Sequence, residues 1–192
     1  MVDTLQKEDL KFDAKPKKFV VWLFVVSSTI MFGGWTSYYI VFAASKGKGH
    51  GLVLPDAFMC STAVLIASSV FLYLSSRALR NGNKSSQQLF LWITLALGLV
   101  FGYLQFQGWS SLYHSGAVLI NNNAAISLIY IVSGFHLLHI VAGVCFILYS
   151  LIGSYRDIPI EKAVYRQEIT SIFWHFIDIL WIYLYVFLLL NS

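Results

Sequence analysis

Five long apolar runs dominate this sequence and restrict what it can fold into. A helix needs about 20 residues to cross the hydrocarbon core of a bilayer. Each run is long enough, and they lie at about 19–43, 54–76, 88–110, 125–152 and 169–190. Hydrophobic residues make up 58% of the chain and charged residues 11%, which is more apolar surface than a soluble domain of this length needs. We therefore predict an all-α polytopic membrane protein with five transmembrane helices and no soluble catalytic domain.

The basic residues predict how this bundle is oriented. Segment 1–18 carries five lysines among four acidic residues, and we expect it to form a solvated cytoplasmic tail ahead of a bundle at 19–192, with its basic end near the headgroups. Eleven of the thirteen basic residues lie in this tail and in the second and fourth loops, against Lys46 and Lys48 elsewhere. The positive-inside rule then places the N-terminus inside and the C-terminus outside. The net charge of +4 is thus a topology signal, with no indication of nucleic-acid binding.

The last apolar run has a polar stripe. Trp174, Asp178 and Trp181 follow one another at helical spacing on one side, with His175 beside them. A carboxylate at the centre of a membrane helix costs roughly 2.5–3.5 kcal/mol on insertion scales. This side must therefore face protein, while the opposite side is apolar.

The fourth run carries the complementary groups. In "GFHLLHIVAG", His136, His139 and Gly143 share one side. The fourth and fifth helices run antiparallel, and His139 and Asp178 both lie near mid-depth. We therefore predict that Asp178 faces the bundle and bonds His136 or His139, sharing His175. The expected polar network comprises His136, His139, Glu168, Trp174, His175, Asp178 and Trp181.

Small residues on the other helices indicate close packing. Helices in lipid associate through small residues that let their backbones approach. We expect packing positions at Ala63, Ala67, Gly98, Gly102, Gln105 and Gly143. Cys60 and Cys145 also fall within spans, and we interpret them as small apolar residues rather than metal ligands or a disulfide.

The spanning histidines leave other interpretations open. His136 or His139 together with His175 would supply the two axial ligands of a b-type haem, which would make the chain a stand-alone di-histidine cytochrome. A proton relay is a third reading, but the spans show no continuous file of titratable groups. The hydrogen-bond network is favoured because it gives Asp178 a partner. No nucleophile–base pair, phosphate loop or CxxC supports an independent enzyme.

Four stretches resemble subunit III of the haem–copper respiratory oxidases, the cytochrome c oxidase subunit 3 family. "EITSIFWHFIDILWIYLY" is similar to the family's last helix, and Glu168, Trp174, His175, Phe176, Asp178 and Trp181 match its signature. "SGFHLLHIVAG", "LPDAFMCSTAVLIASS" and "LGLVFGYLQFQGW" resemble three further helices in the right order. Two positions depart from the family pattern: Thr29 and Gly108 stand where carboxylates are common.

The resemblance implies a role as well as a fold. The chain is similar to a short bacterial form that lacks the first two of the family's seven helices. It implies a non-catalytic subunit III of a proton-pumping terminal oxidase in the bacterial inner (plasma) membrane. Such a subunit carries no haem, copper or other cofactor, binds phospholipids, contacts subunit I chiefly and also subunit II, and stabilises subunit I and its proton-uptake side. The electron donor of the complex, cytochrome c or quinol, depends on other subunits, and an accessory subunit of a nitric oxide reductase is the alternative.

The charge asymmetry generates the first testable prediction. Reporter fusions should show residues before Lys18 in the cytoplasm and Ser192 outside, because eleven basic residues favour the inner side. A C-terminal reporter that is active only in the cytoplasm would mean that the spans are miscounted.

Overall fold

The computed structural model describes residues 2–46, 55–116, 119, 124–156 and 158–190. These residues form five long helices: α1 (Val2–Lys46), α2 (Asp56–Arg80), α3 (Lys84–His114), α4 (Ala124–Tyr155) and α5 (Ile160–Leu190). Each is long and apolar enough to cross a membrane, and no strand occurs among the described residues. The predicted all-α architecture with five spans is confirmed, and α1, α3 and α4 extend past both of their predicted span ends.

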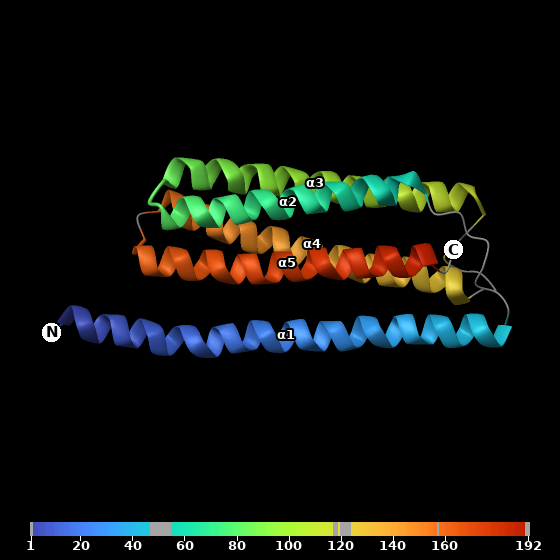
Figure 1. Cartoon of the computed structure of the whole chain (residues 1–192), viewed down its shortest axis with the longest axis horizontal. Helices are drawn as coiled ribbons and strands as arrows, with labels where there is room; N and C mark the ends of the chain where they lie inside the picture. The colour runs from blue at the N-terminus through green and yellow to red at the C-terminus, as the bar shows by residue number, and fades with distance from the viewer. Residues whose placement is uncertain (1, 47–54, 117–118, 120–123, 157, 191–192) are drawn as a thin grey trace.

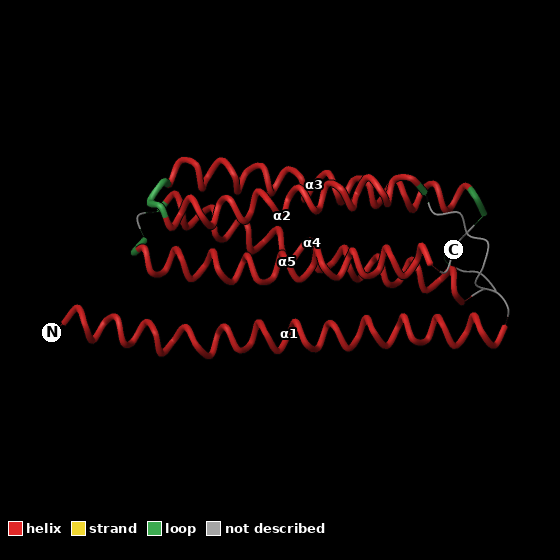
Figure 2. Tube along the Cα trace, viewed as in Figure 1, coloured by secondary structure: helices red, strands yellow, loops and turns green. Residues whose placement is uncertain are grey.

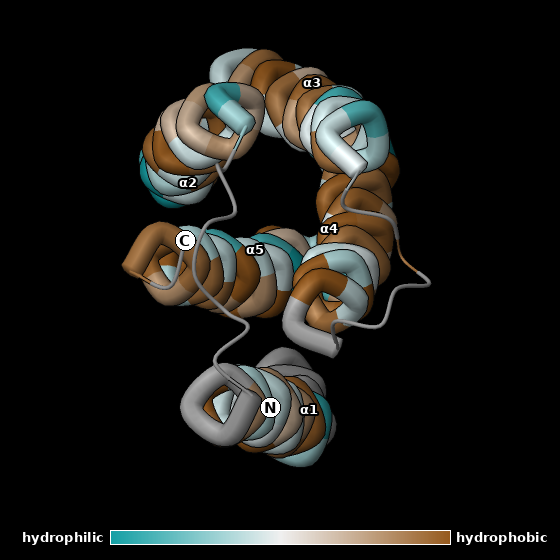
Figure 3. The backbone as a smooth tube through the Cα atoms, turned by 90° about the vertical axis from the view of Figure 1, so that its right-hand side faces the viewer, coloured by the Kyte–Doolittle hydropathy of each residue, from teal (hydrophilic) through white to brown (hydrophobic). Residues whose placement is uncertain are grey.

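Helices α2 to α5 form a closed ring, and α1 lies outside it. Each ring helix packs on the next, with α5 closing the ring against α2, while α1 contacts α4 and α5. Figure 3 views the ring along the helices, with α1 below α4 and α5. α1 is accordingly the span with the smallest buried share.

The turns between α2 and α3 and between α4 and α5 lie at one end of the ring (Figure 2). We call this the basic end, because it carries Arg77, Arg80, Lys84, Arg156, Lys162 and Arg166. The α2–α3 turn is tight because Gly82 adopts a φ of +74°, which strains other residues. Asn83 then caps α3, its side chain accepting a bond from the Ser86 N–H at 3.1 Å.

The predicted tail is helical. Residues 2–18 continue α1 without a break, and in Figure 1 this part extends beyond the basic end of the ring, opposite the C-terminus. The two chain ends therefore lie at opposite ends of the bundle, as five spans require. That residues 2–18 form a separate cytoplasmic tail stays a prediction.

Two tryptophans of α5 fill the ring, and glycines make room for one of them. Trp174 and Trp181 are both fully buried. A methyl group added at Gly98 on α3 would lie 2.8 Å from the Trp174 ring, and one added at Gly143 on α4 would lie 2.9 Å from it. These glycines accommodate an indole rather than bringing two helix backbones together.

The other predicted packing positions differ in how deeply they are buried. Gln105 is buried, and Gly102 has Leu137 as its neighbour, at 3.9 Å from an added methyl group. Ala67 is half-buried, whereas Ala63 is exposed on α2. The expectation that Ala63 packs inside this bundle is therefore corrected, because its side chain is exposed.

The apolar side of α5 is also partly covered. Phe173 and Leu180 are buried, and Phe24 of α1 packs on Phe173 with ring centroids 5.6 Å apart. Because α1, α2 and α4 all contact α5, this helix has the largest buried share of the five spans.

The close approach of Gly98 to the Trp174 ring gives a test of packing. Gly98→Ala should lower the free energy of unfolding by about 1–3 kcal/mol, because the methyl group overlaps a rigid, buried ring. Gly134→Ala on α4 is the matched control. Nothing lies within 4 Å of its added methyl group, and alanine favours helix over glycine by about 1 kcal/mol. Unfolding in mixed micelles measures both, and equal stability of the two variants would contradict this packing.

Candidate functional site

The polar side chains of α5 bond hydroxyl groups on α2 at intervals of seven residues. Trp174 Nε1 donates to Ser68 Oγ at 3.0 Å, and Trp181 Nε1 donates to Thr62 Oγ1 at 3.0 Å. One step earlier on α5, Gln167 Nε2 donates to the hydroxyls of Ser75 at 3.3 Å and Ser76 at 3.2 Å. Since a spacing of seven keeps residues on one helix face, these contacts form a ladder along the α2–α5 contact. We call it the α5 ladder.

Gln167 also joins the other two ring helices. Its side-chain oxygen accepts from Ser150 on α4 at 2.8 Å and from Gln87 on α3 at 3.4 Å. Gln87 in turn accepts from Ser154 at 3.1 Å. This buried cluster fastens all four ring helices near the basic end, and sequence reasoning missed it.

The three spanning histidines point to different neighbours. His139 turns toward α1: its Nε2 lies 3.2 Å from Ser28 Oγ, and its Nδ1 lies 2.7 Å from the Phe135 carbonyl oxygen. His175 Nδ1 lies 2.6 Å from Ser69 Oγ on α2. His136 is buried against Trp181, with ring centroids 5.0 Å apart. Among the described residues, its two nitrogens have no hydrogen-bond partner.

Asp178 is buried, but the predicted histidine bond is wrong. Only 4% of Asp178 is exposed, which confirms that it faces protein. Within the described chain, neither carboxyl oxygen has a hydrogen-bond partner. His139 is turned away toward Ser28 on α1.

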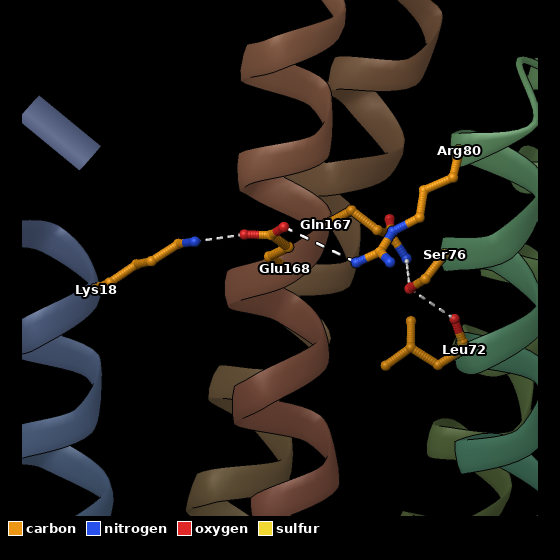
Figure 4. Close-up of polar contacts among 6 residues, drawn as sticks. All are labelled: Lys18, Leu72, Ser76, Arg80, Gln167 and Glu168. Atoms are coloured by element: carbon orange, nitrogen blue, oxygen red, sulfur yellow. Dashed lines mark hydrogen bonds and ion pairs between the residues drawn. The ribbon is translucent and has the colours of Figure 1, made fainter. Parts of the chain in front are cut away.

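Glu168 lies at the basic end, apart from the deeper groups. Its carboxylate pairs with Lys18 of α1 at 2.5 Å and faces Arg80 of α2 at 3.9 Å (Figure 4). Both acid–base pairs are partly exposed, and such pairs contribute about 0–1 kcal/mol. The Lys18 pair therefore positions α1 beside the ring more than it stabilises the bundle.

The histidines do not fit an axial pair for a b-type haem. Both nitrogens of His139 are occupied, and His175 is bonded across to α2. The indole of Trp181 lies against His136. In the described parts of the chain, no three or more His, Cys, Asp or Glu side chains gather as metal ligands. The three histidines therefore make separate contacts with different neighbours.

Comparison with known proteins decides the family. The family model for cytochrome c oxidase subunit III matches residues 4–192. The chain belongs to the cytochrome c oxidase subunit III family. Cytochrome c oxidase subunit 3 of Balaenoptera musculus is 29% identical over 174 aligned positions, covering 85% of this chain and 65% of the whale protein. That of Equus caballus is 26% identical over 193 positions, covering 95% and 72%. This chain thus spans about two thirds of the length of these relatives.

One departure from the family pattern has a structural counterpart. Gly108 is one of the two positions at which the sequence analysis expects a departure from the family pattern. A methyl group added at Gly108 would lie 2.5 Å from the Phe58 ring, and Phe58 is fully buried. In this member of the subunit III family, an aromatic ring from α2 fills the space beside that position.

The separation of the histidines predicts that the chain binds no haem. Full-length protein produced with haem available should show no Soret band, because His136, His139 and His175, the three histidines within the described spans, point to different neighbours. Optical spectra of the purified chain provide the measurement. A stoichiometric six-coordinate haem spectrum would overturn both this prediction and the assignment of a structural role.

Proposed function

We propose that this chain is the non-catalytic subunit III of a bacterial proton-pumping haem–copper terminal oxidase. The observation that supports this most is the match of the subunit III family over residues 4–192. The complex would reduce oxygen in aerobic respiration, with haems and copper in partner subunits and no intrinsic activity in this chain. The alternatives, a nitric oxide reductase accessory subunit and a stand-alone cytochrome, gain no support from the relatives.

The proposed role is to stabilise subunit I and its proton-uptake side. The polar contacts along α5 join this chain's own helices, which suits a rigid support. Large apolar side chains remain exposed on every helix, including Ile30, Ile66, Leu99, Leu138 and Ile179. In a membrane, such surface is covered by lipid or by neighbouring subunits. We propose subunit I as the main contact, with subunit II and phospholipids as further partners in the bacterial inner membrane.

The proposed role predicts a slow failure rather than an immediate one. Oxidase purified without this chain should reduce oxygen at first and then inactivate over repeated turnovers, because the electron-transfer centres lie elsewhere. Oxygen consumption followed over time measures this, and adding the chain back is the control. Immediate and complete loss of activity, with subunit I folded and haem-loaded, would contradict the proposal. Mass spectrometry of the co-purifying chains identifies the complex itself.

A further inference from the structure

A groove of about 440 Å³ lies between α2 and α5 at the basic end of the ring. Pockets that bind small organic molecules have volumes of about 300–1,000 Å³, so this space is large enough for a ligand. Most of its surface is apolar, and its charged groups are Arg77, Arg80 and Glu168. A ligand that fits the groove must therefore combine an apolar part with a charged part.

The charged groups lie at one end of the groove. Gln167 of α5 bonds Ser76 of α2 at 3.2 Å, which sets the two helices level at this end, and each of these residues is followed by a charged one. The contact between His175 and Ser69, at 2.6 Å, lies about two helical turns deeper into the ring. The groove thus has a charged shallow end and an uncharged deep end.

The shallow end carries a net positive charge. Lys18 of α1 pairs with the Glu168 carboxylate at 2.5 Å, and Arg80 faces the same carboxylate at 3.9 Å (Figure 4). Arg77 is exposed and takes part in no ion pair among the described residues. Guanidinium groups form charge-assisted, bidentate hydrogen bonds with phosphate. This end therefore suits an anionic phosphate group.

The deep end of the groove leads onto apolar surface. Tyr73 of α2 and Ile172 of α5 line the groove. Further along the same faces, Val70 and Ile66 follow on α2 and Ile179 follows on α5, and all three side chains are exposed. Because exposed apolar side chains of a membrane helix lie against hydrocarbon, an acyl chain that starts at the shallow end can follow this surface into the bilayer.

We propose that this groove binds an anionic phospholipid of the leaflet at the basic end. Arg77 and Arg80, three residues apart on one face of α2, hold the phosphate, and one acyl chain lies between α2 and α5. Because Lys18 already pairs with Glu168, the ammonium of a zwitterionic headgroup finds no unpaired carboxylate in the groove. The site rests on the proposed partnership with phospholipids, and under the predicted topology it faces the cytoplasmic leaflet.

Native mass spectrometry of the full chain released from detergent tests the class of ligand. One molecule of phosphatidylglycerol should remain bound at concentrations at which phosphatidylcholine with the same acyl chains does not. Inorganic phosphate in large excess should not displace the lipid, because it has no acyl chain. Equal retention of both lipids, displacement by phosphate, or no retained lipid would each overturn the proposal, the last leaving the groove to a helix of a neighbouring subunit.

Arginine variants test the site itself. Arg77→Gln should weaken retention of phosphatidylglycerol by about tenfold or more, because a charge-assisted bond to the phosphate is lost. Arg77→Lys, which keeps the charge, should retain most of the binding. Arg156→Gln is the matched control, since Arg156 is also exposed at the basic end but lies outside the groove. Equal weakening by Arg156→Gln would mean general attraction of anionic lipid and would contradict the site.

A second variant tests the path of the acyl chain. Ser171 lines the groove on α5, and Ser171→Phe should lower retention of phosphatidylglycerol by filling the space while leaving both arginines in place. Unchanged retention in this variant would contradict the acyl-chain path. The measurements use the full chain alone, whereas oxygen consumption of the complex tests the oxidase role, so either proposal can fail without the other.

Discussion

The α5 ladder is the interaction on which the bundle depends. In lipid no hydrophobic force drives helices together, so packing and interhelical hydrogen bonds must hold them. Gln167, Trp174 and Trp181 each donate to hydroxyls on α2, and their spacing of seven fixes the register of α5 against α2. Because α2 and α5 are the first and last helices of the ring, these bonds also close it.

The two tryptophans of α5 inside the ring determine which residues the other helices place opposite them. An indole that spans the interior requires small residues opposite it, and Gly98 and Gly143 supply them for Trp174. For Trp181 the interior is instead lined by Phe58, Phe101 and His136, at centroid distances of 5.0 to 5.9 Å. α1 packs on the outside of the ring through contacts such as His139 with Ser28 and Lys18 with Glu168.

The sequence predicts the five helices and the burial of the Asp178 side of α5, because apolar length and stripe position are properties of single segments. It does not predict which neighbour each group meets, because α5 is contacted by α1, α2 and α4. Hence the predicted bond between Asp178 and α4 is wrong. A usable signal is present on α2: Ser68 and Ser75 lie seven residues apart, the same spacing as their partners Trp174 and Gln167. The Gln167 cluster has no comparable signal, since it joins residues from four separate helices.

The energetics show why a carboxyl is tolerated at Asp178. Inserting it costs roughly 2.5–3.5 kcal/mol, and no hydrogen bond within the described structure offsets that locally. The α5 ladder has four donated bonds on the same helix, and at an average of about 0.6 kcal/mol each they contribute about 2 kcal/mol. The two quantities are of similar size, so the ladder keeps α5 in place despite Asp178. Asp178 therefore adds to the cost of inserting α5, and the hydrogen bonds made by the same helix offset that cost.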